Sequence, residues 1–194
     1  METKSDRQRL REVFSKINPL SEAEWKKFEP LLETATFGKN DFLIREGQVE
    51  KHISFICEGM VRVYLIDADK DISLDFGFEN TFVTSYASFL QRLPSAVSIE
   101  ALSETRVLRF SHNKLYRFYE ESHQAERMGR LIAEYQYIRK NSREVSLLKY
   151  TATQRYLQLL EQQPRLVQEI PVKYLASYLG VEPESLSRIR KSLA

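Results

Sequence analysis

The sequence has little cysteine and no long apolar run. Cys57 is the single cysteine among 194 residues, which excludes a disulfide framework, a zinc site of several thiolates and a four-cysteine iron–sulfur cluster. No stretch approaches the ~18 consecutive apolar residues that a membrane span requires. The opening residues, METKSDRQRLRE, contain no apolar signal core. We therefore expect a cytoplasmic protein with no membrane partner.

Glycine and proline are also scarce, at six each, which excludes collagen-like and low-complexity chains. The balance of 42% hydrophobic and 29% charged residues is that of a folded globular protein. The net charge of +2 is unevenly distributed. Residues 139–194 hold ten Lys and Arg against five Asp and Glu, whereas residues 1–138 hold 19 against 22. A basic C-terminal third favours a nucleic-acid-binding module, with a solvated basic surface as the alternative.

The hydrophobic period changes along the chain and predicts an α+β fold. Residues 5–35 carry apolar residues at helical spacing, and residues 35–110 alternate with a period of two. The polar run Asp67–Asp71 suits a hairpin turn between two such strands. Several short strands at close spacing predict a β-roll or jelly-roll barrel with flanking helices. A short helix packed on the barrel is expected near residues 81–93.

A long helix is predicted over residues 124–148, after which the pattern stays helical. One face of this helix has residues separated alternately by three and four positions, apolar except for Ser142, and this spacing is typical of a two-stranded coiled coil. We therefore expect this helix to form a homodimer, the alternative being that the stripe packs on the chain's own barrel. The residues of this seam are Met128, Leu131, Tyr135, Ile138, Ser142 and Val145.

Residues 172–191, VKYLASYLGVEPESLSRIRK, fit the 20-residue frame of a helix-turn-helix. Ala176 at the fifth place lets two helices cross closely, and Gly180 at the ninth permits a left-handed turn. Pro183 stands in the first turn of the second helix, where proline is tolerated. The small core would be formed by Leu175, Leu179, Val181, Leu186 and Ile189. The alternative is an ordinary helical hairpin with charged exposed residues.

The second helix of this frame carries side chains suited to reading DNA. An arginine such as Arg188 can bind guanine through two hydrogen bonds, and Glu184 can accept one from cytosine N4. Lysine and arginine can also contact phosphates. The candidate DNA-binding residues are Lys173, Glu184, Ser185, Ser187, Arg188, Arg190 and Lys191.

A strand-rich domain, a long seam helix and this motif together resemble the Crp/Fnr family of bacterial transcription regulators. The segment IREGQVEKHISFICEGMVRVYL is similar to the family's turn-and-strand region, with Gly47 and Gly59 at its turn glycines. SIEALSETRVLRF is similar to the strand pair before the dimer helix, and GVEPESLSRIRK to the recognition helix.

The resemblance implies three parts. They are a cyclic-nucleotide-binding-like effector domain at residues 1–123, a dimerisation helix at 124–148 and a helix-turn-helix DNA-binding domain at 149–194. It further implies a homodimer that reads a pseudo-palindromic operator in double-stranded DNA, and RNA polymerase as a partner where such a protein activates transcription. A hairpin preceding the motif is implied near residues 166–170.

Two departures from the family pattern bear on the ligand and on the operator. Cyclic-AMP-binding members carry a Gly-Glu pair for the ribose, which Gly77-Phe78-Glu79 only approximates, and an arginine for the phosphate, which residues 93–96 lack. Burying a cyclic phosphate without a cation costs on the order of several kcal/mol. Tight cyclic AMP binding is therefore not expected, and neither the effector nor any cofactor is identified. On the recognition helix, Pro183 stands in the place of the family's first arginine, whereas Glu184 and Arg188 match the next two positions.

An effector pocket on the barrel would be lined by Phe76, Glu79, Phe82, Ser85, Tyr86, Phe89 and Ser95, although these aromatic side chains could equally fill the core.

Two other classes of function compete with DNA reading. A cupin-like barrel enzyme needs clustered metal-binding histidines, but the strand region 35–110 contains only His52. The sequence carries no Gly-rich phosphate loop or nucleophile–base arrangement either, so we expect no metal site and no enzyme. The third class is a protein-interaction module whose helix-turn-helix no longer reads DNA.

Overall fold

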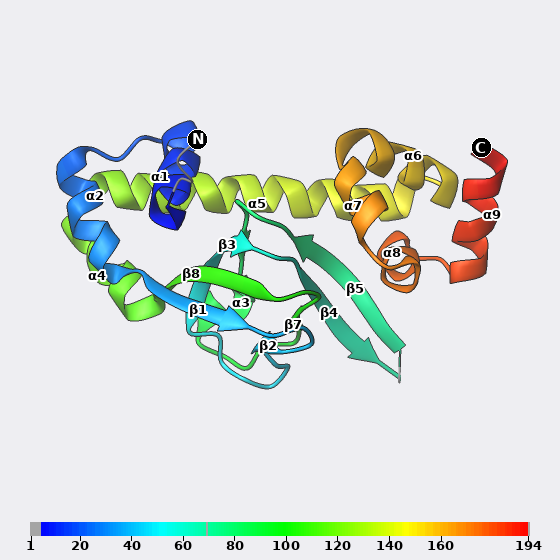
Figure 1. Ribbon diagram of the computed structural model, residues 1–194, viewed down its shortest axis with the longest axis horizontal. Coiled ribbons are helices and arrows are strands. Elements are labelled where there is room, and N and C mark those ends of the chain that lie inside the picture. Colours follow the sequence, from blue (N-terminus) through cyan, green and yellow to red (C-terminus); the bar gives the residue numbers. More distant parts are fainter. Residues whose placement is uncertain (1–4, 69, 194) are drawn as a thin grey trace. The chain divides into compact units, whose positions relative to one another are not determined.

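The computed structural model describes residues 5–68 and 70–193, and it has the predicted α+β fold (Figure 1). The described residues form an antiparallel β-roll of eight short strands, preceded and followed in the sequence by helices. Before the roll come α1 (Asp6–Ile17), α2 (Glu22–Phe28) and the 3-10 turn η1 (Glu29–Leu31). Helix α1 begins with a capping box, in which the Ser5 hydroxyl accepts from the Gln8 N–H.

The roll contains two four-stranded sheets. The first has the order β1 (Glu33–Phe37), β8 (Thr105–Ser111), β3 (His52–Glu58) and β6 (Phe82–Val83). The second has the order β2 (Phe42–Ile44), β7 (Ser98–Ala101), β4 (Val61–Asp67) and β5 (Lys70–Gly77). In the first sheet β8 pairs antiparallel with both neighbours, with Glu33 opposite Arg109 and His52 opposite Ser111. The predicted hairpin turn is confirmed between Asp67 and Lys70, although Asp69 lies outside the described residues.

Helix α3 (Tyr86–Gln91) interrupts the strands where a short helix is predicted. After the roll, the long helix α5 (His123–Lys149) confirms the periodic pattern. The remaining helices are α4 (His112–Glu121), α6 (Ala152–Gln162), α7 (Pro164–Glu169), α8 (Val172–Leu179) and α9 (Pro183–Leu193). The prediction of a hairpin near residues 166–170 is wrong. Pro164 begins a helix instead, because proline suits the first helical turn and Leu166 and Val167 are buried on one side of it.

Aromatic side chains build the core between the N-terminal helices and the roll. The Phe28 ring of α2 lies 5.3–5.9 Å from the rings of Phe14, Trp25, Phe110 and Phe118. Tilted and edge-on pairs of this kind contribute roughly 0.5–1.5 kcal/mol each beyond their burial. This cluster joins α1, α2 and α4 to β8, next to the N-terminal part of α5 (Figure 1).

The described chain divides into two compact units. The first contains the residues up to Val63 and Gly77–Tyr135, and the second contains Tyr64–Phe76 and the residues from Gln136 onward. The three parts with boundaries at residues 123 and 148 stay a prediction. The hairpin of β4 and β5 and the C-terminal part of α5 group with the last four helices, because arginines on α5 contact the hairpin directly.

Candidate functional site

The second unit contains the geometry that the 20-residue frame predicts (Figure 1). Helix α8 ends at Gly180, which has φ +68° and lies in the left-handed region that glycine adopts without steric cost. The Val181 N–H then donates to the Ala176 carbonyl at 3.0 Å, which closes the turn before α9 begins at Pro183. Leu175, Leu179 and Leu186 of the predicted small core are buried, as is Ala176 at the predicted close crossing. Val181 and Ile189 are half-buried.

The candidate base-reading side chains lie on the outer face of α9. Glu184, Ser187 and Arg188 are exposed, and Ser185 is half-buried. Arg188 Nη2 donates to the Ser185 hydroxyl at 3.2 Å, and the Ser187 hydroxyl turns back to the Pro183 carbonyl at 3.0 Å. The Arg188 guanidinium is thus oriented by its own helix while it remains accessible.

The candidate phosphate-binding residues fall into two groups. Lys191 is exposed, and the exposed Lys173 Nζ lies 3.8 Å from an Asp71 carboxylate oxygen, a distance at which a surface pair contributes little. Arg190 is different, because its guanidinium donates to the Val167 carbonyl at 3.2 Å and lies over the Tyr156 ring. Arg190 therefore has contacts within its unit, and its phosphate contact stays a prediction.

Sequence reasoning missed Arg155, which holds the end of α8. This arginine of α6 donates to the Leu179 carbonyl through both Nε (3.1 Å) and Nη2 (2.7 Å), and it also donates to the Tyr150 carbonyl. The last carbonyls of a helix lack partners within the helix, and a cation there is also favoured by the helix dipole. The contact joins residues that are 24 positions apart and leaves no periodic trace in the sequence.

Seam residues of α5 differ in exposure. Met128 is 4% exposed and packs in the core of its own chain with Ala125 and Phe118. Further along, Tyr135 and Ile138 are 63% and 62% exposed, and Val145 is also exposed. Leu131 is half-buried and Ser142 is exposed. The N-terminal end of the predicted seam is therefore covered by the chain itself. Its apolar residues from Tyr135 onward are exposed.

In the first unit, the buried carboxylate of Glu50, which precedes β3, contacts Ser85 at the start of α3. Glu50 is buried, and its carboxylate accepts the N–H groups of Lys51 and His52 at 2.9 Å and that of Ser85 at 3.4 Å. Burial raises the pKa of Glu50, and the backbone hydrogen bonds act in the opposite direction. The Ser85 hydroxyl accepts from the hydroxyl of Ser95, at 2.8 Å.

The same segment is fixed at its other end by Arg92. This residue ends α3 in the left-handed region, with φ +59°, and its Nη1 donates to the Glu50 carbonyl at 2.6 Å. The Ser88 hydroxyl accepts from the Glu50 N–H at 2.9 Å and donates to the Leu93 carbonyl. Arg92, which directly precedes the expected phosphate position at residues 93–96, thus donates to a backbone carbonyl.

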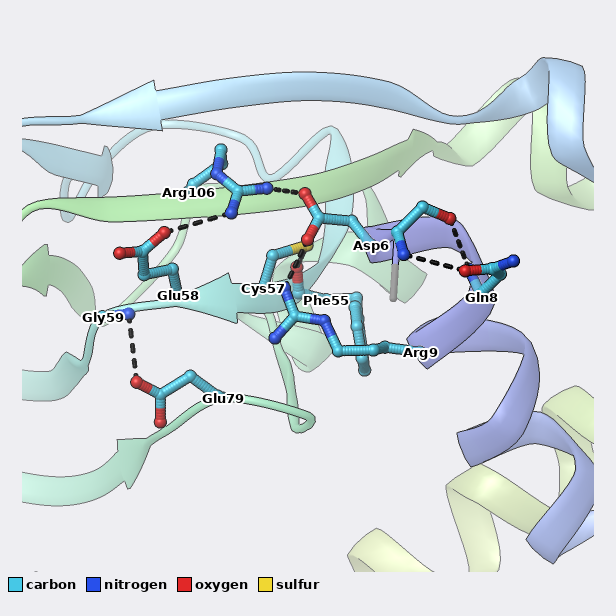
Figure 2. A network of polar contacts seen from close by, with 10 residues as sticks. Asp6, Gln8, Arg9, Phe55, Cys57, Glu58, Gly59, Glu79 and Arg106 are labelled. Carbon is cyan, nitrogen blue, oxygen red and sulfur yellow. Dashed lines mark hydrogen bonds and ion pairs between the residues drawn. The ribbon is translucent and has the colours of Figure 1, made fainter. Parts of the chain in front are cut away.

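The seven residues predicted to line an effector pocket lie in different surroundings, and the pocket stays a prediction. Phe89 is in the core, and Phe82 packs 5.3 Å from Phe55. Glu79 accepts from the Gly59 N–H at 3.3 Å, at the turn between β3 and β4 (Figure 2). Phe76 belongs to the second unit and lies edge-on to Tyr178, at 5.5 Å.

Ser85, Tyr86 and Ser95 of that set lie at or near the start of α3. Tyr86 is half-buried, and burial raises the pKa of its hydroxyl. A cavity of about 500 Å³ occurs instead in the second unit, between α5, α6 and the end of α8. The described residues that line this cavity include none of the seven.

Figure 2 shows the polar contacts that join α1 to the roll. Arg106 of β8 forms ion pairs with Asp6 of α1 and with Glu58, the latter at 3.0 Å, and Arg9 also donates to Asp6. Cys57 is buried beside them, and its burial raises the pKa of the thiol. These contacts hold the N-terminal helix on the first sheet.

Among residues 5–68 and 70–193, no group of three or more His, Cys, Asp or Glu side chains is placed to hold a metal ion. No helix in the same ranges is long and apolar enough to cross a membrane.

Comparisons with known proteins agree with this architecture. Residues 34–122 match the sequence profile of the family described as "Cyclic nucleotide-binding domain". A comparison with curated protein sequences finds no match.

Several solved structures have the same fold at low sequence identity. FixK2 from Bradyrhizobium japonicum has a TM-score of 0.71 at 19% identity, covering 84% of each chain. The c-di-GMP-responsive global regulator CLP of Xanthomonas campestris has a TM-score of 0.69 at 16% identity, over 89% of this chain and 91% of that one. The catabolite activator protein of Thermus thermophilus has a TM-score of 0.57 at 15% identity, over 90% and 84%. Residues 34–122 are thus similar to a cyclic nucleotide-binding domain, and the chain shares its fold with these solved structures.

Proposed function

We propose that the protein is a homodimeric transcription regulator that binds a pseudo-palindromic operator in double-stranded DNA through the α8–α9 pair. The observation that carries the proposal is the left-handed turn at Gly180, which joins two tightly packed helices and leaves the polar face of α9 open. The fold shared with FixK2 and CLP supports it further.

In this function α9 enters the major groove. Arg188 donates to guanine O6 and N7, and Glu184 accepts from cytosine N4 on a neighbouring base pair. Lys191 and Lys173 contact phosphates, which supply affinity and a dependence on salt. Arg190 also contacts a phosphate in this proposal, although one of its guanidinium nitrogens donates to the Val167 carbonyl.

The dimer forms along α5 through the exposed apolar residues of the seam. Tyr135, Ile138 and Val145 supply the apolar surface, and a second copy of the same helix covers it best, because a 3-4 spacing matches a two-helix partner. Two-fold symmetry then places two α9 helices in successive major grooves, about 34 Å apart. The operator is accordingly an inverted repeat.

The start of α3 does not suit a cyclic nucleotide. The ligand's phosphate needs a cation, but residues 93–96 carry no arginine, and Arg92 donates to the Glu50 carbonyl. The Glu50 carboxylate also accepts the Ser85 N–H and would repel a phosphate there. Cyclic AMP is therefore not a tight ligand of this chain, and any signal to the roll comes from a different effector.

This function belongs in the cytoplasm, where the protein has access to the genome. An activating role would add contacts with RNA polymerase. A metal-dependent barrel enzyme is the competing class, and the finding of stoichiometric metal in the purified protein would favour it.

The test is selection of fragmented genomic DNA from the source organism by the purified protein at two salt concentrations. We expect enrichment of one inverted repeat, with affinity falling steeply as salt rises. Binding without sequence preference would contradict base reading by α9. No binding even at low salt would favour the interaction module instead.

A further inference from the structure

Arg143 of α5 contacts both the hairpin of the roll and the α8–α9 pair. Its Nε donates to the Leu74 carbonyl at 3.1 Å, and its Nη2 donates to the Tyr178 carbonyl at 2.8 Å and to the Ser73 carbonyl at 3.5 Å. The guanidinium also lies 3.7 Å from the centre of the Tyr178 ring. A planar guanidinium can donate in several directions and stack at the same time, which a lysine ammonium cannot do. One side chain therefore ties together α5, β5 and the end of α8.

Ser177 adds a second link between α8 and β5. Among the described strands, β5 is the last in its sheet, so one of its edges has no strand partner there. The Ser177 hydroxyl accepts the Ser73 N–H at 2.9 Å and donates to the Asp71 carbonyl at 3.1 Å. The Tyr178 ring packs against Phe76 beside these bonds. Helix α8 thus covers the open edge of β5 and satisfies its polar groups.

These contacts determine where the reading helix stands relative to the seam. Arg143 directly follows Ser142 of the predicted seam, so the helix that meets the second copy also binds the end of α8. Arg155 fixes the next carbonyl of α8 from α6. The Gly180 turn and α9 follow immediately, so any rotation of α8 against α5 is passed to α9.

We propose that Arg143 is a positioning residue that sets the distance between the two half-sites of the operator. The inference rests on the proposed function, since it needs a dimer that reads DNA. A rigid link between the seam and α9 fixes the distance between the two α9 helices of the dimer. That distance determines the spacing of the half-sites. Without the link, each α9 can take several orientations relative to α5, and several spacings become acceptable.

The experiment is selection from a library of duplexes that carry the enriched half-site as an inverted repeat with spacers of different lengths. We expect the wild type to select one spacer. The variant Arg143→Met keeps the long stem but removes the donors. We expect its preference for that spacer over one two base pairs longer to fall by about tenfold, the effect of removing one good charged hydrogen bond. Its affinity for a duplex with a single half-site should stay within about twofold of wild type.

Two further variants separate positioning from the effects of charge or stability. Lys140→Met removes an exposed cation from the same helix, and we expect it to keep the sharp spacing preference. Arg143→Lys should recover little of that preference, because an ammonium cannot make the same set of bonds. If Arg143→Met does not fold, Ser177→Ala removes the edge contact alone and should also broaden the spacing.

An Arg143→Met protein that binds all spacers more weakly but keeps the sharp preference would overturn the proposal. So would a Ser177→Ala protein with the wild-type preference, where Arg143→Met does not fold. A wild type that enriches no inverted repeat would instead contradict the proposed function, and so the two failures are distinguishable.

Discussion

Arg188→Ala is the substitution that most directly tests whether α9 reads bases. Arg188 is exposed, and its guanidinium donates a hydrogen bond of 3.2 Å to the hydroxyl of Ser185 on the same helix. A bond between such groups at the surface contributes little to stability, so the free energy of unfolding should change by less than about 0.5 kcal/mol. Any larger effect on DNA binding then comes from the interaction with DNA itself.

The size of that effect follows from the base contact proposed. A bidentate pair between arginine and guanine discriminates against the wrong base by about 1–3 kcal/mol, which corresponds to roughly 5- to 150-fold in affinity. The dimer makes this pair in both half-sites. When the two sites are independent, the affinity for a symmetric operator should therefore fall by the square of this factor. Affinity for random DNA should change much less.

The assay is titration of the operator and of a scrambled duplex of equal length, each at several salt concentrations. The control is Lys191→Ala, in which an exposed cation of the same helix is removed. It should weaken both duplexes alike and reduce the salt slope by about one unit for each phosphate that the lysine neutralises. Equal decreases in affinity for the two duplexes with Arg188→Ala would refute the base-reading role of Arg188.

Three further outcomes are expected. Gly180→Ala places a side chain at φ +68° and should lower the free energy of unfolding by about 1–2 kcal/mol in denaturant titrations; an unchanged midpoint would contradict the strain. Ile138→Glu adds a charge to the exposed part of the seam and should shift the sedimentation of the protein from dimer to monomer. An unaffected dimer would show that the interface lies elsewhere. Burial raises the pKa of Glu50, so its contribution to stability is present below the ordinary glutamate range and disappears as pH rises through the raised value. The stability of wild type relative to Glu50→Gln should therefore fall as the pH rises above the ordinary glutamate value of about 4, and a constant difference would show that the pKa of Glu50 is the same in the folded and unfolded protein.

The parts of this protein that the sequence predicts are those that depend on local rules. The α8–α9 pair is predicted by Gly180, because a left-handed turn favours glycine. Apolar residues at helical spacing on either side of it predict the two helices. The long helix and the β4–β5 hairpin follow from their periods in the same way. The hairpin expected near residues 166–170 fails because it came from resemblance, whereas Pro164 and the buried Leu166 favour a helix at that place.

The parts that could not be predicted depend on contacts between distant positions. Arg143 and Arg190 look alike in the sequence, as cations in a basic region, yet each donates to a carbonyl of a segment far along the chain. Met128 has the spacing of a seam residue, but the core formed by α2 and α4 covers it. Periodicity identifies an apolar face without saying which partner covers it.

Glu50 shows how far such a contact changes the functional interpretation. A glutamate in a turn before a strand suggests a solvated surface charge. The fold instead buries it, and its carboxylate accepts three backbone N–H groups, one of them from Ser85 at the start of α3. An anionic effector that binds there would have to displace this carboxylate or neutralise it, and Arg92 is not free to help because it donates to the Glu50 carbonyl. The contacts of Glu50 and Arg92 therefore disfavour an anionic ligand at the start of α3.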